Sequence, residues 1–419
     1  MTDTRSTLPP QLLLSPNAAG IARAAQLLKS GNLIILPTET VYGIAVNLSS
    51  PTARAVARAL KGVGGAGGGN ANSHWVLHLA QPDDILSWVP SLSRIGRRLI
   101  AKALPGPIAF QIKLAPADAD AARKRLGDAA SETLAPITQD SGLKTPDFYL
   151  TFRVPEIPAT QQVLAEVADP VAIIGAGSAA GAVYEIADLP ESLFQPPVSL
   201  AGRGASAEGI DAPVAGTGQT LAAILDAGRT RYRAPSTVVR IDGGGGDQFS
   251  VVRPGVIDER IVQKMADFLI LFICSGNTCR SPMAAAIATR ILADKLGIEP
   301  PELPLRHIVV QSAGVHAARG MRAAREAIEA AKSYNADLSG HLSQSASTDL
   351  LRRADVIYTM TDTHREEVLN AFPAAAKKTF RLDPDDDIDD PIGAGFPVYQ
   401  QVAEHLSNLL HKRLSELQI

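Results

Sequence analysis

The amino-acid sequence predicts an α/β protein of more than one domain, with a doubly wound parallel sheet in its second half. Three observations support this prediction. The chain has 419 residues, which is more than a single compact domain usually holds. Strand-like and helix-like segments alternate along the chain, as they do in α/β proteins. Hydrophobic residues make up 46% of the chain, so a substantial core is expected.

The first half, which we assign to residues 11–258, has short apolar runs and amphipathic segments. They predict helices at 21–28 and 51–60 and strands at 33–36, 148–154, 171–174 and 237–241. Glycine-rich segments at 62–69 and 243–246 are typical of a loop and a surface turn. Residues 115–144 are rich in Ala and Asp without a clear buried face, which predicts an insertion, and we place a linker at 259–266.

The second half, residues 267–419, opens with a continuous apolar run and closes with an amphipathic helix. The predicted strands are 268–274, 307–311 and 355–360, and the predicted helices are 282–296, 322–332 and 347–353. In the last helix, apolar side chains recur every three or four residues, at Val402, Leu406, Leu409, Leu410, Leu414 and Leu417. Such a stripe is expected to pack against a sheet.

Charge and cysteine content exclude several classes of protein. The formal net charge is only -3, so no strong overall field directs the chain to nucleic acid or lipid. No apolar run reaches the length of a membrane span, and the N-terminus lacks the pattern of a secretory signal. The two cysteines exclude a disulfide scaffold and a four-thiolate zinc site. We therefore expect a cytoplasmic protein without a membrane partner.

The segment Cys274–Pro282, with the sequence CSGNTCRSP, is the most informative in the chain. It follows a predicted strand and precedes a predicted helix, where Ser281 is suited to the cap and Pro282 to the first turn. Inward-facing N–H groups of such a loop, with the helix dipole, form a cradle for an anion. The same field is expected to lower the pKa of Cys274 and make its sulfur a nucleophile. The predicted phosphate-binding residues are Ser275, Gly276, Asn277, Thr278, Cys279 and Ser281, and Arg280 can fork onto two phosphoryl oxygens.

A general acid is needed to protonate the leaving group. Asp389 and Asp390 precede Pro391, far downstream of the cysteine loop. Loops at the carboxyl ends of the strands of a doubly wound sheet converge on one crevice, so this separation is no obstacle. We assign the acid to Asp390, which immediately precedes the proline.

These residues resemble the low-molecular-weight protein tyrosine phosphatase family, over about residues 267–419. Its pattern, C-x-G-N-x-C-R-S-P near the start of the domain with an Asp-Pro loop near the end, is present here, as are 312–316 (SAGVH) and 358–361 (YTMT). The resemblance implies a metal-free reaction on a phosphorylated protein, without a cofactor. Cys274 attacks phosphorus, Asp390 protonates the leaving group, and water hydrolyses the phosphocysteine. It also implies that oxidation can join Cys274 and Cys279 reversibly.

The substrate stays open between phosphotyrosine and phosphoarginine. Members that resemble arginine phosphatases carry threonine where this chain has Thr278, whereas tyrosine-specific members tend to carry a larger aliphatic residue. His316 stands where an aromatic wall for phosphotyrosine is expected, and Ile392 replaces the usual aromatic residue after Asp-Pro.

The first half carries a second resemblance, on 36–44 (LPTETVYGI), 152–155 (FRVP), 235–239 (PSTVV) and 252–255 (VRPG). These segments are similar to the YrdC/YciO-like threonylcarbamoyl-adenylate synthase family. The resemblance implies a twisted α/β fold, and in active members a basic cavity that binds ATP, bicarbonate and L-threonine. The implied ligand-binding residues are Thr38, Tyr42, Lys61, Arg153, Ser178, Ser236 and Arg253.

Two motif positions of this half depart from the family. Val63 stands in place of the arginine of K-x-R, and Ala180 in place of the asparagine of S-x-N. Each loss removes a contact to a charged ligand, so the ATP site is expected to be eroded. Two functions stay open, adenylate synthesis for tRNA modification and binding of a nucleotide, tRNA or double-stranded RNA. The candidate phosphate contacts for RNA are Arg54, Arg58, Lys61, Arg94, Arg97 and Arg98.

The histidines, including His364 and His405, lack the spacing of metal ligands. We interpret them as surface or packing residues and predict no metal site.

Overall fold

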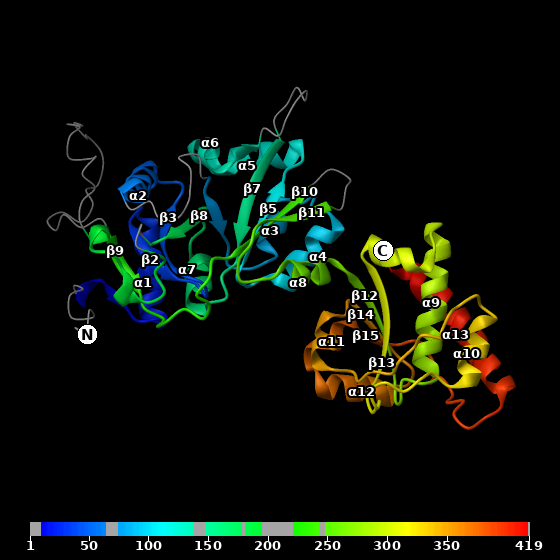
Figure 1. Ribbon diagram of the computed structural model, residues 1–419. Helices are drawn as coiled ribbons and strands as arrows, with labels where there is room; N and C mark the ends of the chain where they lie inside the picture. Colours follow the sequence, from blue (N-terminus) through cyan, green and yellow to red (C-terminus); the bar gives the residue numbers. More distant parts are fainter. Residues whose placement is uncertain are drawn as a thin grey trace, which may run out of the picture. The chain divides into compact units, whose positions relative to one another are not determined.

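The computed structural model describes residues 10–63, 74–137, 147–177, 181–194, 221–242 and 248–417 (Figure 1). The chain divides into two compact units, residues 1–263 and 264–419. Each unit contains its own β-sheet. The two units are described separately below.

The N-terminal unit is built on a mixed sheet of 11 strands, in the order β1-β9-β2-β3-β8-β4-β7-β5-β10-β11, with β6 beside β7. Its strands are β1 Leu13–Leu14, β2 Leu33–Pro37, β3 Tyr42–Asn47, β4 Val76–His78, β5 Ile108–Lys113, β6 Ala135–Ile137, β7 Asp147–Arg153, β8 Val171–Gly175, β9 Leu221–Leu225, β10 Thr237–Asp242 and β11 Gln248–Arg253. β2 and β8 both run antiparallel to β3, whereas β4 runs parallel to β7. Sequence reasoning located β2, β7, β8 and β10 to within a residue or two.

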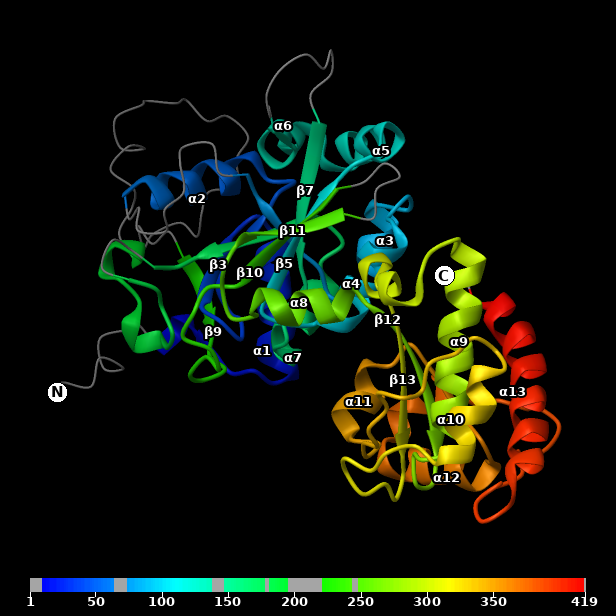
Figure 2. The same ribbon diagram turned by 45° about the vertical axis from the view of Figure 1, so that its right-hand side comes forward.

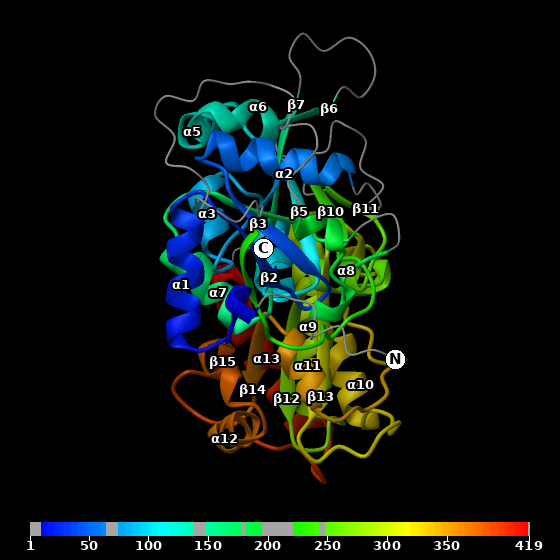
Figure 3. The same cartoon turned by 90° about the vertical axis from the view of Figure 1, so that its left-hand side faces the viewer.

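The helices of this unit are α1 Ala18–Lys29, α2 Pro51–Val63, α3 Asp84–Trp88, α4 Arg94–Ala103, α5 Pro116–Leu126, α6 Ala130–Thr133, α7 Pro158–Glu166 and α8 Glu259–Ala266. Short 3-10 turns lie at Pro10–Leu12, Gly127–Ala129, Ile186–Asp188 and Glu191–Phe194. α1 and α7 lie side by side (Figure 3), and their apolar faces share one core cluster with β2. Leu28, Ile34 and Val163 are fully buried in that cluster.

Two segments of this half are more regular than the sequence indicated. Residues 116–126, expected to lack a clear buried face, form the helix α5, whose buried residues are Asp118, Ala119, Ala122 and Leu126. Alanine methyl groups form a narrow apolar stripe, which is a weak hydrophobic signal in the sequence. The segment at 259–266, where we expected a linker, contains the boundary between the two units, after residue 263, and it forms the helix α8 (Figure 2), on which Val262 and Ala266 are fully buried.

The predicted glycine-rich loop falls almost entirely outside the described residues. α2 continues through Gly62 to Val63, and residues 64–69 are not described. The predicted turn at 243–246 is also outside the described residues.

The C-terminal unit contains a parallel four-stranded sheet in the order β13-β12-β14-β15, which agrees with the predicted doubly wound arrangement. Its strands are β12 Phe268–Cys274, β13 Ile308–Gly314, β14 Val356–Thr359 and β15 Thr379–Arg381. Its helices are α9 Arg280–Leu296, α10 Arg325–Lys332, α11 Thr348–Arg353, α12 Asp362–Ala371 and α13 Phe396–Glu416, with 3-10 turns at Pro300–Arg306 and Pro373–Lys378.

Helices cover both faces of this sheet. α9, α10 and α13 lie on one side, and α11 and α12 on the other (Figure 1). Alternate residues of β12 pack into the core clusters on the two faces of the sheet. Ile270 and Phe272 lie on the α9 side, and Leu269 and Leu271 lie on the α11 side. Because all four strands are parallel, their carboxyl ends meet at one edge.

Among the described residues, no helix combines the length and the apolar character that crossing a bilayer requires.

Candidate active site

The cysteine loop connects the end of β12 to the start of α9. β12 ends at Cys274 and α9 begins at Arg280, so both residues are fixed by regular structure. The helix is capped by Cys279 without a side-chain hydrogen bond. Ser281 therefore does not cap the helix as expected, because it lies inside the first turn and its hydroxyl points to the loop.

Polar hydrogens surround the sulfur of Cys274. The Ser281 hydroxyl oxygen lies 2.9 Å from Cys274 Sγ, and the backbone N–H of Asn277 donates to Sγ over 3.3 Å. The cysteine is only 3% exposed. These donors are placed to stabilise a thiolate more than a thiol.

Burial nevertheless raises the pKa of the Cys274 thiol, contrary to the lowered pKa expected from the sequence. The hydrogen bonds from Ser281 and Asn277 and the charge of Arg280 act in the opposite direction. The loss of solvation of the charged sulfur raises the pKa by more than these contacts lower it. Ionisation of Cys274 therefore depends on every donor that the loop supplies.

Asn277 is the residue that fixes the shape of the loop. Its φ of 55° is in the left-handed region, whereas the neighbouring Gly276 has no positive φ. The Asn277 Nδ2 donates to the hydroxyls of Ser281 (3.0 Å) and Ser312 (2.9 Å), and its Oδ1 accepts from the Gln344 backbone N–H (2.9 Å). These bonds hold the left-handed backbone that aims the Asn277 N–H at the sulfur.

Gly314, at the end of β13, allows the loop to lie against the sheet. A Cβ at this position would come within 2.3 Å of the Ser275 carbonyl oxygen and 2.9 Å of the Asn277 nitrogen. Only glycine fits such a close approach of two backbones. Gly314 belongs to the 312–316 motif noted in the sequence, but its role in this close approach was not predicted.

Arg280 and Asp390 are brought together although 110 residues separate them. The Arg280 Nη2 donates to Asp390 Oδ2 over 2.5 Å, and its Nη1 donates to the Ile388 carbonyl over 3.0 Å. Arg280 is 5% exposed, whereas the Asp390 side chain is 41% exposed. A buried guanidinium thus faces an accessible carboxylate beside the cysteine loop.

His364, interpreted from the sequence as a surface or packing residue, contacts the loop directly. Its Nε2 lies 2.7 Å from the Ser275 hydroxyl, and its Nδ1 lies 2.8 Å from the hydroxyl of Thr361, which caps α12. Burial lowers the pKa of His364, and the charge of Arg280 lowers it further. Its position just after the carboxyl end of β14 is a signal that sequence reasoning could have used and did not.

The remaining loop residues have partners of different kinds. Thr278 is half-buried, and its hydroxyl lies 3.7 Å from Cys279 Sγ. Cys279 is buried, with its sulfur 3.3 Å from the Tyr399 hydroxyl, and both cysteines are free thiols.

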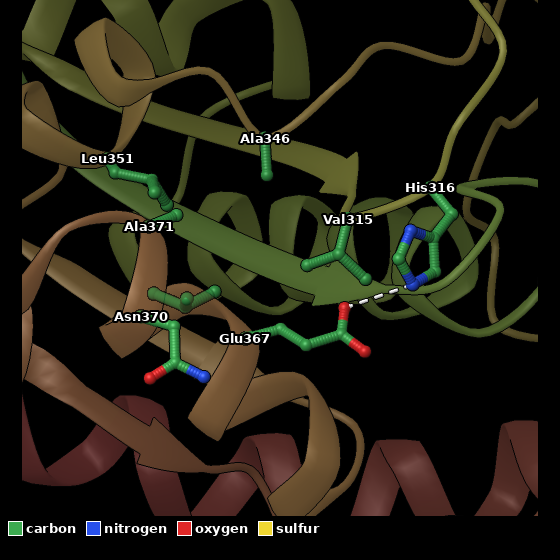
Figure 4. A pocket seen from close by; sticks show the side chains of 8 residues that line it. Val315, His316, Ala346, Leu351, Glu367, Asn370 and Ala371 are labelled. Atoms are coloured by element: carbon green, nitrogen blue, oxygen red, sulfur yellow. Dashed lines mark ion pairs between the residues drawn. The ribbon is translucent and has the colours of Figure 1, made fainter.

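The side chains expected to flank the substrate lie near the protein surface. The His316 Nε2 lies 3.2 Å from a carboxylate oxygen of Glu367 (Figure 4), and the His316 side chain is 70% exposed. Ile392 is 69% exposed. Neither position supplies an aromatic surface.

In the N-terminal unit, the structure brings Thr38 and Arg153 together in a buried polar cluster. The Arg153 Nη2 donates to Glu39 Oε1 (2.6 Å) and Thr40 Oγ1 (2.7 Å), and lies 3.4 Å from Thr38 Oγ1. The Arg153 Nε is buried without a hydrogen-bond partner among the described residues. Such an unused donor is available to a ligand.

The other predicted ligand residues of this unit fall into three groups. Arg253 donates to the Ser236 carbonyl over 3.0 Å, and burial followed by the charge of Arg153 lowers its pKa. The Tyr42 hydroxyl donates to the Gly228 carbonyl over 2.6 Å, and burial raises its pKa. Ser178 and Ala180 lie outside the described residues, as do the side chains of Lys61 and Val63.

His78 is a buried residue of this cluster that sequence reasoning missed. It pairs with Arg153 in the register of β4 and β7, and its Nε2 has no hydrogen-bond partner among the described residues. Burial lowers its pKa to about 3, and the charge of Arg153 contributes. A single histidine in a short strand offers no signal in the sequence.

Three of the cations predicted as RNA contacts have partners within the unit. Arg54 is buried, and both it and Arg58 pair with Glu132. Arg97 donates to the carbonyl oxygens of Leu92 and Pro90. These three side chains are therefore engaged within the unit.

Two family models match the chain. The Sua5/YciO/YrdC model, described as "Telomere recombination", matches residues 26–255, which is more than half of the chain. The model described as "Low molecular weight phosphotyrosine protein phosphatase" matches residues 269–419.

Among curated proteins, the chain is 35% identical over 156 residues to a protein-arginine-phosphatase of Geobacillus stearothermophilus, covering 36% of this chain and 97% of that protein. It is 31% identical to the low molecular weight protein-tyrosine-phosphatase PtpB of Staphylococcus epidermidis, and this match covers 34% of this chain and 94% of that protein.

A solved low molecular weight protein tyrosine phosphatase from T. tengcongensis is 34% identical, with a TM-score of 0.33, and the match covers 36% of this chain and all of that one. The sequence matches place a hydrolase of the low-molecular-weight phosphatase type in the C-terminal half. The chain thus belongs to the Sua5/YciO/YrdC family through residues 26–255 and to the low-molecular-weight phosphotyrosine protein phosphatases through residues 269–419.

Proposed function

We propose that the C-terminal unit removes phosphate from phosphoarginine side chains of proteins, with Cys274 as nucleophile, Arg280 as phosphate clamp and Asp390 as general acid. The observation that carries this proposal is the Arg280–Asp390 pair beside the cysteine loop. It joins the cation that a phosphoryl group needs to the acid that a leaving group needs.

In the first step, the Cys274 thiolate attacks phosphorus and the P–N bond breaks. The electron pair of that bond stays on the guanidine nitrogen, which takes a proton from the Asp390 carboxyl. Arg280 and the loop N–H groups hold the phosphoryl oxygens, whose charge is spread in the transition state. The products are arginine and a phosphocysteine.

In the second step, water attacks the phosphorus of the phosphocysteine. Asp390, now a carboxylate, takes a proton from this water, and the S–P bond breaks. Inorganic phosphate leaves and the Cys274 thiolate is restored. The Ser281 hydroxyl, 2.9 Å from the sulfur, is placed to stabilise the departing thiolate.

Three observations favour phosphoarginine over phosphotyrosine. The half-buried Thr278 presents a hydroxyl, which suits a polar guanidine better than an aromatic ring. The exposed positions at His316 and Ile392 lack the aromatic side chains that would stack on a tyrosine ring. Relatives named as protein-arginine-phosphatases reach 35% and 32% identity.

The test compares phosphoarginine and phosphotyrosine peptides of the same sequence with the full-length protein, alongside p-nitrophenyl phosphate. We expect turnover of all three, with the largest kcat/KM for phosphoarginine, and loss of turnover in Cys274→Ser. Ser345→Ala, at an exposed serine outside the cysteine loop, serves as the control and is expected to stay active. Equal rates for the wild type and Cys274→Ser would refute the catalytic assignment, and a preference for phosphotyrosine would refute the substrate.

We also propose that the N-terminal unit binds ATP at the cluster of Thr38, Arg153 and Arg253. Burial and then the charge of Arg153 lower the pKa of Arg253, and the Arg153 Nε is an unused buried donor, so this cluster favours an anionic ligand. Val63, in place of the second cation of the family motif, leaves this site short of one contact. We therefore expect nucleotide binding with little or no adenylate synthesis.

Calorimetric titration with ATP tests this second proposal. Arg253→Met is expected to weaken binding at least ten-fold, whereas Arg240→Met, a control on β10, is expected to leave it unchanged. Pyrophosphate release with L-threonine, bicarbonate and ATP measures synthesis in the same preparation. An absence of ATP binding would reject the proposal, and rapid pyrophosphate release would show that the site is not eroded.

A further inference from the structure

We propose that a cavity beside the cysteine loop binds an apolar side chain of the substrate protein, close in sequence to the phosphorylated residue. This inference rests on the proposed phosphatase function and extends it from the phosphoryl group to the flanking sequence. The cavity lies between the loop after β13 and the helices α11 and α12 (Figure 4). Its volume is about 480 Å³.

The lining of the cavity combines five apolar residues with three polar ones. The apolar lining residues are Val315, Ala346, Leu351, Val368 and Ala371. At one end the His316 Nε2 lies 3.2 Å from a carboxylate oxygen of Glu367, and Asn370 lies away from this pair, beside Ala371 (Figure 4). A hollow of this composition favours a hydrocarbon side chain over a charged one.

Both walls of the cavity form hydrogen bonds with the cysteine loop. On one wall, the backbone N–H groups of Val315 and His316 donate to the carbonyl oxygens of Cys274 and Ser275, each over 3.0 Å. On the other wall, α12 carries His364, whose Nε2 lies 2.7 Å from the Ser275 hydroxyl. The cavity and the phosphate cradle therefore share their framework.

The direction of α12 orients the cavity relative to the catalytic edge. α12 begins at Asp362, just after β14, so its first turn lies at the carboxyl edge of the sheet. Glu367 lies about one turn further along than His364, and Ala371 about one more. The end of the cavity lined by His316 and Glu367 is thus the end nearer the cysteine loop, and the end lined by Asn370 and Ala371 lies further from it.

An extended polypeptide can reach this cavity from the loop. Such a chain advances about 3.3 Å per residue and sends alternate side chains to the same side. With the phosphorylated residue over Cys274, a residue one or two positions away can therefore enter the hollow beside His316 and Val315. The carboxylate of Glu367 at the entrance disfavours an acidic residue at that position.

The experiment uses the full-length protein and phosphoarginine peptides with Leu or Ser at each of the two positions before and after the phosphorylated residue. We expect Leu at one of these positions to raise kcat/KM about ten-fold over Ser, in line with partial burial of an aliphatic side chain. The ratio of the two peptides is the measured quantity, because it does not depend on the fraction of active protein.

Filling the cavity tests its location. Ala371→Phe is expected to reduce the Leu/Ser ratio to near one, and the smaller Ala371→Leu is expected to reduce it partially. Ala376→Phe, the same change at an exposed alanine that does not line the cavity, is expected to leave the ratio unchanged.

A Leu/Ser ratio near one at all four positions in the wild type would overturn the proposal. A ratio that survives in both Ala371 variants would overturn it as well, because the preference would then arise elsewhere. Absence of p-nitrophenyl phosphate turnover in the wild type would instead overturn the proposed phosphatase function, and the inference with it. These failures are thus distinguishable.

Discussion

Asp390 Oδ2 lies 2.5 Å from Arg280 Nη2, so the residue proposed as general acid is held by the residue proposed as phosphate clamp. A phosphoryl group that enters the loop must share this guanidinium with the carboxylate. Because Arg280 also donates to the Ile388 carbonyl, the whole 388–390 segment is linked to the start of α9. Substrate binding and placement of the acid are therefore coupled through one side chain.

This relationship predicts that Asp390→Asn slows turnover most where the leaving group needs a proton. General acid catalysis typically contributes about 10²- to 10⁴-fold, so we expect a loss in that range for phenyl phosphate. Nitrophenolate is a better leaving group, and we expect a smaller loss of kcat for p-nitrophenyl phosphate. Steady-state kinetics with both esters check the prediction.

Asp389→Asn is the matched control, because Asp389 is the exposed neighbour of Asp390, whereas the ion pair with Arg280 is made by Asp390. It is expected to keep nearly full activity. Equal losses for the two esters in Asp390→Asn, or an equal loss in Asp389→Asn, would contradict the assignment of the acid.

A second prediction concerns the ionisation of Cys274. Burial raises the pKa of its thiol, and the Ser281 hydroxyl bond is the largest opposing contribution. Ser281→Ala removes that bond, so the pKa of the Cys274 thiol is expected to rise further. At a fixed pH less thiolate is present, and the rising limb of the pH profile moves to higher pH.

The rate of alkylation of Cys274 by iodoacetamide as a function of pH, followed by peptide mass, measures this shift. Ser345→Ala, at an exposed serine outside the sulfur's contacts, is the control. A pH profile of Ser281→Ala that coincides with that of the wild type would show that the hydroxyl does not stabilise the thiolate.

A third prediction concerns substrate choice at Thr278. Thr278→Ile replaces a hydroxyl in the cysteine loop by an aliphatic group, which suits an aromatic ring better than a guanidine. We expect the ratio of phosphoarginine to phosphotyrosine kcat/KM to fall about ten-fold, the size of one lost polar contact. Thr363→Ile, at an exposed position of α12, is expected to leave the ratio unchanged. An unchanged ratio in Thr278→Ile would remove Thr278 from the argument for phosphoarginine.

The sequence predicted the parts of the site that follow one another in the chain. Cys274 and Arg280 are fixed by the end of a strand and the start of a helix, and both boundaries have strong local signals. The Asp390 loop was placed by the general rule that loops at the carboxyl edge of a parallel sheet converge.

The contacts that span the fold were not predictable in the same way. His364, Ser312 and Gln344 reach the loop from α12, from β13 and from the segment before α11, respectively, and no spacing in the sequence records those contacts. The direction of the Cys274 pKa shift also depends on how completely the sulfur is buried, which a motif does not specify.

The buried histidine of the N-terminal unit gives a prediction about stability and pH. Burial lowers the pKa of His78 to about 3, well below the ordinary value of 6.5. The unfolded chain therefore binds a proton between these two pH values and the folded unit does not. The free energy of unfolding is expected to be unaffected by His78 above pH 6.5 and to fall by about 1.4 kcal/mol for each pH unit below it.

The variant His78→Asn cannot take up this proton, so its stability is expected to fall less steeply with acidity. Urea unfolding followed by tryptophan fluorescence at pH 5 and pH 7 measures the difference. Both tryptophans of the chain, Trp75 and Trp88, belong to the N-terminal unit, so the signal reports on that unit. His411→Asn, at an exposed position of α13, is expected to behave as the wild type. A steep dependence on pH that persists in His78→Asn would assign the acid sensitivity to other groups.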